Sequence, residues 1–92
     1  MWEVRETRAA AKALDRAPAE VKRNYDAWVQ IVRLHGPRGL RDIKGFHDEA
    51  LSGALHGARS SRLSLKWRVI YTVSTDVVTV EVRDVNAHTY RR

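Results

Sequence analysis

The chain has 92 residues, 43% of them hydrophobic and 30% charged, which is typical of a folded domain and argues against intrinsic disorder. Seventeen Lys and Arg against eleven Asp and Glu give a net charge of +6, which favours a polyanionic partner, although generic solubility would explain it too. The absence of cysteine excludes disulfides and thiolate metal sites, and the chain shows no apolar run of about 20 residues and no signal-peptide pattern. We therefore expect one domain over residues 1–92, located in the cytoplasm, with no membrane partner.

The first third of the chain predicts a strand followed by two helices. Residues 2–6 alternate between apolar and charged, as in a short strand. Thr7 can cap a helix that begins at Arg8, and a second helix follows Pro18 and stops at Gly36. Apolar residues recur with the helical period in both helices: Ala10, Ala13, Leu14 and Ala17, then Val21, Tyr25, Trp28, Val32 and His35. Because only a few residues join them, we expect an antiparallel helical hairpin that covers an apolar surface.

The stretch from Pro37 to Gly57 is the least regular part of the sequence. All five glycines fall in it or directly before it: Gly36, Gly39, Gly45, Gly53 and Gly57. The stretch predicts a loop, one short helical turn and the start of a strand. It contains neither a Walker spacing nor a GxGxxG motif, so we do not interpret it as a phosphate-binding loop.

The remaining residues predict strands. Apolar residues occupy every second position from Leu63 to Val73, which indicates one half-buried strand or two strands joined by a tight turn near residues 65–66. A β-branched run from Val77 to Val85 predicts the last strand. The order β-α-α-β-β-β is typical of an α+β domain, with the helical hairpin packed on one face of a small sheet rich in antiparallel pairs.

One face of these strands carries positive charge. Four basic residues and no acid occur between residues 59 and 71: Arg59, Arg62, Lys66 and Arg68. If the odd-numbered positions from 63 to 73 face the core, then Arg62 and Arg68 project from the opposite, open face. Guanidinium groups fixed on a sheet are suited to binding phosphate, because each presents a planar fork of donors. A solvated outer face without a ligand is the competing interpretation.

Three segments together resemble the RelE/ParE superfamily of bacterial toxins: Leu51–Gly57, Arg59–Ser64 and Trp67–Tyr71. The likeness includes the length, the element order, the basic charge and a tail with His and Tyr, and it is nearest to the ribosome-dependent branch of RelE-, YoeB- and HigB-type toxins. The resemblance implies the toxin of a type II toxin–antitoxin system. Such a toxin is an endoribonuclease (an mRNA interferase) that cuts mRNA in the A site of the 30S ribosomal subunit without a metal or small-molecule cofactor. Its partner would be an acidic antitoxin that wraps around it.

The resemblance also implies site residues. YoeB-type members use a glutamate, an arginine on the central strand and a C-terminal His-Tyr pair, and these roles would fall to Glu49, Arg68, His88 and Tyr90. Thr89 separates the last two, which is a departure from the family pattern. RelE-type members rely instead on lysines and arginines. Substrate contacts would come from the other basic residues: Arg59, Arg62, Lys66, Lys44, Arg91 and Arg92.

RNA cleavage without a metal needs a base for the 2′-OH proton, donors for the charged phosphorane and an acid for the 5′-oxygen that leaves. Glu49 or His88 is a plausible base, since the surroundings can tune either group toward neutral pH. Arg62 and Arg68 would hold the scissile phosphate and stabilise its developing charge. His88 or Tyr90 could protonate the leaving group, and the product would be a 2′,3′-cyclic phosphate.

Two other functions compete with this one. A ParE-like protein of the same fold would inhibit DNA gyrase by binding and would need no acid/base set. A non-catalytic RNA-binding domain is the third possibility. It is disfavoured because Tyr90 is the one good candidate for an exposed stacking aromatic.

Overall fold

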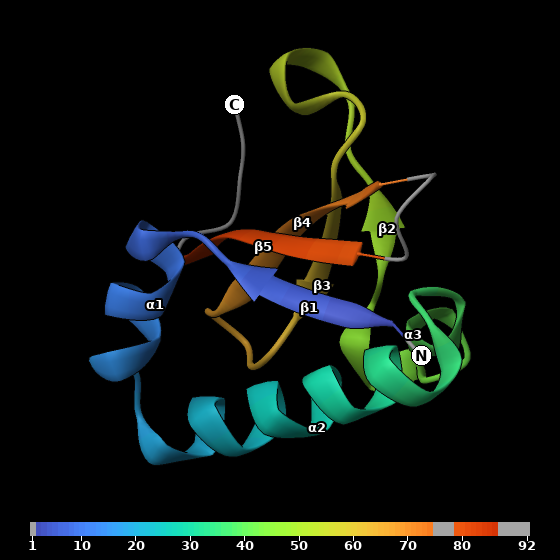
Figure 1. Cartoon of the computed structure of the whole chain (residues 1–92). Coiled ribbons are helices and arrows are strands. Elements are labelled where there is room, and N and C mark those ends of the chain that lie inside the picture. Colours follow the sequence, from blue (N-terminus) through green and yellow to red (C-terminus); the bar gives the residue numbers. More distant parts are fainter. Residues whose placement is uncertain (1, 75–78, 87–92) are drawn as a thin grey trace.

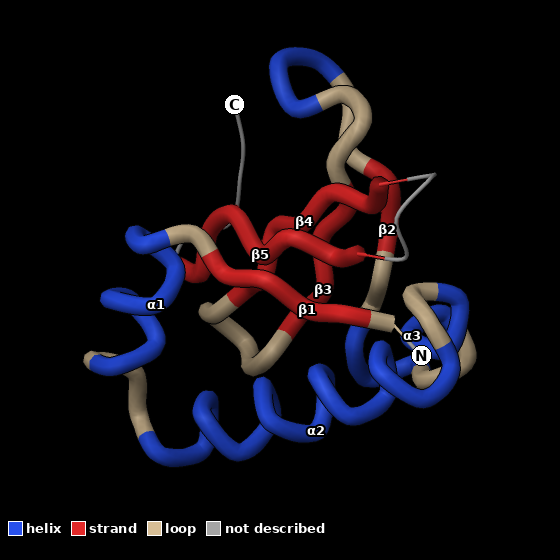
Figure 2. The backbone as a smooth tube through the Cα atoms, in the orientation of Figure 1, coloured by secondary structure: helices blue, strands red, loops and turns tan. Residues whose placement is uncertain are grey.

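The computed structural model describes residues 2–74 and 79–86, with a central sheet and helices packed around it (Figures 1 and 2). The strands are β1 (Glu3–Glu6), β2 (Glu49–Ala50), β3 (Arg59–Arg62), β4 (Arg68–Ser74) and β5 (Thr79–Asn86). The helices are α1 (Arg8–Asp15), α2 (Ala19–His35) and α3 (Arg38–Arg41), with two short 3-10 turns, η1 (Lys44–Phe46) and η2 (Gly53–Leu55).

The five strands form one sheet in the order β1-β5-β4-β3-β2. β1 runs parallel to β5, and the other three pairs are antiparallel. The α+β class and the antiparallel-rich sheet predicted from the sequence are therefore confirmed. Of the two alternatives for residues 63–73, the structure has two strands with a tight turn, which the Leu63 N–H closes by donating to the Trp67 carbonyl at 2.7 Å.

The helix boundaries follow from local chemistry. The Thr7 hydroxyl accepts a hydrogen bond from the Ala10 N–H at 3.1 Å and so caps α1, as predicted. Pro18 stands directly before α2, whose first turn does not need the missing N–H. α2 ends at Gly36, which has a φ of +77° that a side chain would strain, and the Trp2 indole packs against it.

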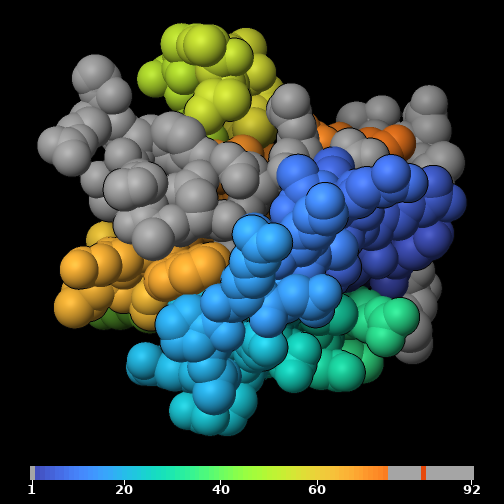
Figure 3. All heavy atoms as spheres, turned by 90° about the vertical axis from the view of Figure 1, so that its left-hand side faces the viewer, coloured from blue at the N-terminus to red at the C-terminus, as the bar shows by residue number. Residues whose placement is uncertain are grey.

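The core lies between the helices and the sheet. Trp28 of α2 is fully buried, and its ring stacks on Tyr25 and meets Tyr71 of β4 edge-on, with centroids 5.7 and 5.3 Å away. α1 packs mainly against β5, and α2 packs against β1 and α3. Figure 3 shows α1 lying across one side of the molecule, with the turn between β3 and β4 projecting beside it. The helices therefore pack against one face of the sheet.

The structure corrects two details of the strand pattern. Leu65 is 84% exposed rather than in the core, because it sits at the turn that joins β3 to β4. The sheet face opposite the helices is also not uniformly open, since Ser60 and Ile70 on that face are buried. Val77 and Val78 of the predicted last strand lie outside the described residues.

Candidate functional site

The register of β3 and β4 brings two arginines together. Arg62 pairs directly with Arg68 across the strands, so both side chains leave the same face of the sheet. That face is opposite the helices, because Tyr71, three residues after Arg68, packs on Trp28 of α2. The structure therefore places both arginines on the face on which the sequence predicted them.

Two like charges at directly opposed positions destabilise a sheet, because their Cβ atoms lie only about 4.5–5.5 Å apart. Arg68 Nη1 donates to the buried Ser60 hydroxyl at 3.2 Å, which fixes one guanidinium over the strand. The Arg62 Nε is buried and has no hydrogen-bond partner among the described residues. A buried donor without an acceptor is unfavourable, and the two guanidinium groups repel each other, so an anion bound on this face would stabilise both residues. We call Arg62 and Arg68 the arginine pair.

A carboxylate reaches the same face from the neighbouring strand. Glu49 of β2 pairs with Ser60 of β3, which places its exposed side chain on the side of the sheet that carries the arginine pair. Ser60 is two residues from Arg62, so Glu49 and Arg62 are diagonal neighbours with backbones about 7–8 Å apart. The three residues thus form one polar surface made by β2, β3 and β4.

Asp48, the residue before Glu49, points to the opposite face of the sheet and is buried. The Asp48 side chain is fully buried and accepts hydrogen bonds from Arg59 Nε at 2.7 Å, from the Ser61 hydroxyl at 2.6 Å and from the Tyr71 hydroxyl. These partners lie on the helix-covered face. Burial raises the pKa of Tyr71, and its hydrogen bond to the carboxylate raises it further. The Asp48 cluster is therefore a buried structural network that ties the start of β2 to β3 and β4.

This network separates the candidate residues into groups. Arg59, predicted as a substrate contact, is held by Asp48 on the face away from the arginine pair. Lys44 in η1 and Lys66 in the turn are both exposed. The candidate tail residues lie outside the described residues: His88, Tyr90, Arg91 and Arg92.

Sequence reasoning assigned no role to Asp48. The one signal in the sequence is its position next to Glu49. Neighbouring residues of a strand point to opposite faces, so an Asp48 beside an exposed Glu49 is expected to point inward. Within residues 2–74 and 79–86, no three His, Asp or Glu side chains come together as a metal site would require. The described helices include none with the length and apolarity needed to cross a membrane.

The sheet order, the helices around it and the basic polar face define a domain with the fold of the RelE/ParE toxins. Over 95% of its length the structure matches a YoeB/ParE toxin from Agrobacterium tumefaciens, with a TM-score of 0.76, 18% identity and 99% of that chain covered. It matches the archaeal RelE–RelB complex from Pyrococcus horikoshii OT3 with a TM-score of 0.75 and 21% identity, covering 98% of each chain. A third match is the toxin–antitoxin complex RelBE2 from Mycobacterium tuberculosis, with a TM-score of 0.63, 23% identity, and coverage of 95% of this chain and 98% of that one.

These matches confirm the resemblance to the RelE/ParE superfamily at the level of the fold. No protein-family model matches the sequence, and no curated protein matches it either. The fold persists at identities of 18–23% because it depends on burial pattern and strand register, which many sequences satisfy.

Proposed function

We propose that this protein is the toxin of a type II toxin–antitoxin system and acts as a ribosome-dependent endoribonuclease on mRNA. The observation that carries the proposal is the arginine pair, two opposed guanidinium groups on one sheet face with Glu49 beside them. Proteins of the same fold have been solved as the RelE–RelB complex from Pyrococcus horikoshii OT3 and as the YoeB–YefM toxin–antitoxin complex from Staphylococcus aureus. By analogy with these complexes, we propose that an acidic antitoxin binds this chain.

The proposed chemistry uses the arginine pair to hold the scissile phosphate. Arg68 is already oriented by Ser60, and the unpaired Arg62 Nε would gain a phosphate oxygen as its acceptor. Both cations would stabilise the charge that grows on the phosphorane, which is commonly the largest single contribution in such reactions. The negative charge of the substrate would also relieve the repulsion between the two guanidinium groups.

Proton transfer in this proposal involves Glu49 or His88. Glu49 would take the proton of the 2′-OH, whose oxygen attacks the phosphorus and forms a 2′,3′-cyclic phosphate as the P–O5′ bond breaks. His88 or Tyr90 would return a proton to the 5′-oxygen. His88 could instead be the base. The tail roles are part of the proposal, because these residues lie outside the described part of the chain.

The direct test replaces Arg68 by alanine. We expect growth inhibition to disappear and mRNA cleavage to fall by about a hundred- to a thousand-fold, as for loss of one donor to a developing oxyanion. The variant should stay folded, because it loses one hydrogen bond, to Ser60, which contributes only about 1 kcal/mol. The measurements are mapping of RNA 5′ ends in cells that express the protein and a thermal melt of the purified variant.

Two controls make the result specific. Arg23→Ala removes an exposed arginine of α2 on the helical side and should leave cleavage unchanged. Arg68→Lys keeps the positive charge but loses the planar fork of donors, so its cleavage rate should lie between those of the wild type and Arg68→Ala. A folded Arg68→Ala protein with full RNA cleavage would refute the site. Gyrase-dependent DNA breaks without new RNA 5′ ends would favour the ParE-like function instead.

A further inference from the structure

A buried serine lies among the residues of the proposed site. Ser60 is 1% exposed and occupies the middle of the polar surface, because β3 pairs it with Glu49 on one side and with Ile70 on the other. Arg68, two residues from Ile70, reaches Ser60 diagonally across the strands and donates to its hydroxyl through Nη1 at 3.2 Å. A buried hydroxyl is unfavourable without a hydrogen bond, and a small apolar residue would avoid that cost. The Ser60 hydroxyl therefore has a role beyond packing, and its described partner is Arg68.

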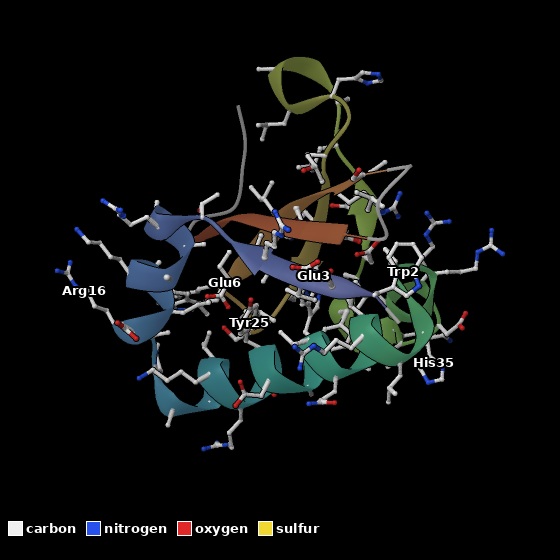
Figure 4. All side chains as sticks on the ribbon, in the orientation of Figure 1. Trp2, Glu3, Glu6, Arg16, Tyr25 and His35 are labelled. Atoms are coloured by element: carbon white, nitrogen blue, oxygen red, sulfur yellow. The ribbon has the colours of Figure 1, made fainter. Side chains whose placement is uncertain are left out.

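Two polar contacts on the helix side of the sheet use a carboxylate instead. The Tyr25 hydroxyl donates to Glu6 at 2.6 Å, and Figure 4 shows these two side chains meeting between α2 and the end of β1. Arg59 is held at 2.7 Å by the fully buried carboxylate of Asp48. A carboxylate fixes a guanidinium group firmly but also neutralises its charge. Arg68 is fixed by a neutral hydroxyl, and no described acid forms an ion pair with it, so its positive charge remains available to an anion.

The atom that Arg68 uses for this contact determines which of its donors stay free. A guanidinium group has five N–H donors in one plane. Nη1 lies on the side of the group opposite to the Nε–H, so its bond to Ser60 leaves the edge formed by Nε and Nη2 without a described partner. That edge carries two parallel N–H groups, which is the arrangement that binds a phosphate through two of its oxygens. Ser60 thus orients Arg68 while leaving this edge free.

We propose that Ser60 is a positioning residue of the nuclease, whose hydroxyl holds Arg68 with its Nε–Nη2 edge free for the scissile phosphate and with its charge unneutralised. The predicted effect of Ser60 on cleavage rests on the proposed function, whereas its effect on the Arg68 side chain does not. Donors that are already in place stabilise a transition state most, because they need no rearrangement as the charge develops. Loss of the hydroxyl should therefore slow the chemical step more than it weakens substrate binding.

The test is a double-mutant cycle between Ser60 and Arg68, with mRNA cleavage measured over a range of concentrations of the ribosome–mRNA complex. Ser60→Ala should lower kcat by about tenfold, as expected for loss of a hydrogen bond to a charged group, and should change KM by less than about twofold. In the Arg68→Ala background the same substitution should change kcat by less than about twofold, because Ser60 acts through Arg68. Ser60→Thr keeps a hydroxyl and should restore most of the rate.

Ser61→Ala is the matched control, since it removes the same hydroxyl one residue away on the helix-covered face. It should lower the melting temperature, because the buried Asp48 carboxylate loses a donor, but it should leave kcat unchanged while the protein is folded. Ser60→Ala should melt close to wild type, since Arg68 is only partly buried and its freed Nη1 can bind water. Wild-type kcat in Ser60→Ala would overturn the inference. An unfolded Ser60→Ala protein would also overturn it, by making Ser60 structural.

A measurement on the free protein separates this inference from the proposed function. The Nε–H of Arg68, followed by ¹⁵N relaxation, should be rigid in the wild type and mobile in Ser60→Ala. Equal mobility in the two proteins would overturn the positioning role and leave the nuclease untouched. A loss of kcat on Ser60→Ala that persists in the Arg68→Ala background would overturn it too, because Ser60 would then not act through Arg68. Wild-type protein that cleaves no mRNA, together with loss of Arg68 rigidity in Ser60→Ala, would refute the nuclease and support the positioning.

Discussion

Replacing Asp48 by alanine should reduce the free energy of unfolding by roughly 3–5 kcal/mol, as expected when one partner of a buried ion pair is removed. The loss follows from the three donors that the carboxylate accepts. The hydroxyls of Ser61 and Tyr71 belong to fully buried residues, and each would lose a partner at about 1–3 kcal/mol. Arg59 loses its ion pair, but its side chain is 22% exposed and can recover part of its hydration. A domain of this size has a total stability of about 5–15 kcal/mol, so the variant should be close to unfolding at 37 °C.

Urea denaturation followed by tryptophan fluorescence measures this loss directly. Asp48→Asn keeps the shape of the side chain, and its amide can still hydrogen-bond with the two hydroxyls. Its loss of unfolding free energy should therefore be smaller and should come mainly from the lost ion pair with Arg59. Asp42→Ala, at an exposed acid without a side-chain partner among the described residues, should change stability by no more than about 0.5 kcal/mol. If Asp48→Ala unfolds within about 1 kcal/mol of wild type, the Asp48 cluster does not hold the sheet together and our reasoning about this face is wrong.

Three further outcomes follow from the structure. Gly36→Ala should destabilise the protein by roughly 1–3 kcal/mol, because Gly36 has a φ of +77° and an added Cβ would lie 2.6 Å from the Trp2 ring; an unchanged melting temperature would contradict this. Burial raises the pKa of both Tyr25 and Tyr71. The contribution of these two protonated hydroxyls to stability should therefore be fully present below the unfolded tyrosine pKa of about 10 and should decrease as the pH rises above it. Removing either hydroxyl with a Phe substitution should reduce that alkaline loss in a pH series of melts. Glu49→Gln should slow RNA cleavage by about 10²–10⁴-fold if Glu49 is the base, whereas an unchanged rate would leave that role to His88.

The helices and the order of helices and strands along the chain could be predicted from the sequence because their signals are local. Thr7 and Gly36 mark where helices start and stop through hydrogen bonds and a backbone angle that depend on a few neighbouring residues. The alternating apolar residues likewise place Val69 and Tyr71 in the core. The prediction that Leu65 faces the core was wrong, because a turn interrupts the alternation at that residue. For residues 63–73 the sequence alone did not decide between one strand and two strands.

The candidate site was predictable only in part, since it depends on register between strands that are distant in sequence. The sequence indicated which face Arg62 and Arg68 share, but not that they stand directly opposite one another. It also gave no reason to separate Arg59 from them, because the ion pair of Arg59 comes from a loop eleven residues earlier in the chain. Long-range pairs of this kind have no local signature.

The adjacent acids Asp48 and Glu49 show how strand alternation separates a carboxylate of the buried network from a carboxylate of the proposed site. Strand alternation places Asp48 on the helix-covered face, where its carboxylate accepts hydrogen bonds from Arg59 and two hydroxyls. It places Glu49 on the face of the arginine pair. A slip of one residue in β2 would exchange the two, burying Glu49 and exposing Asp48. The Asp48 cluster opposes that slip, because three hydrogen bonds would be lost at once. The buried acid therefore fixes the register that keeps the neighbouring carboxylate beside Arg62 and Arg68.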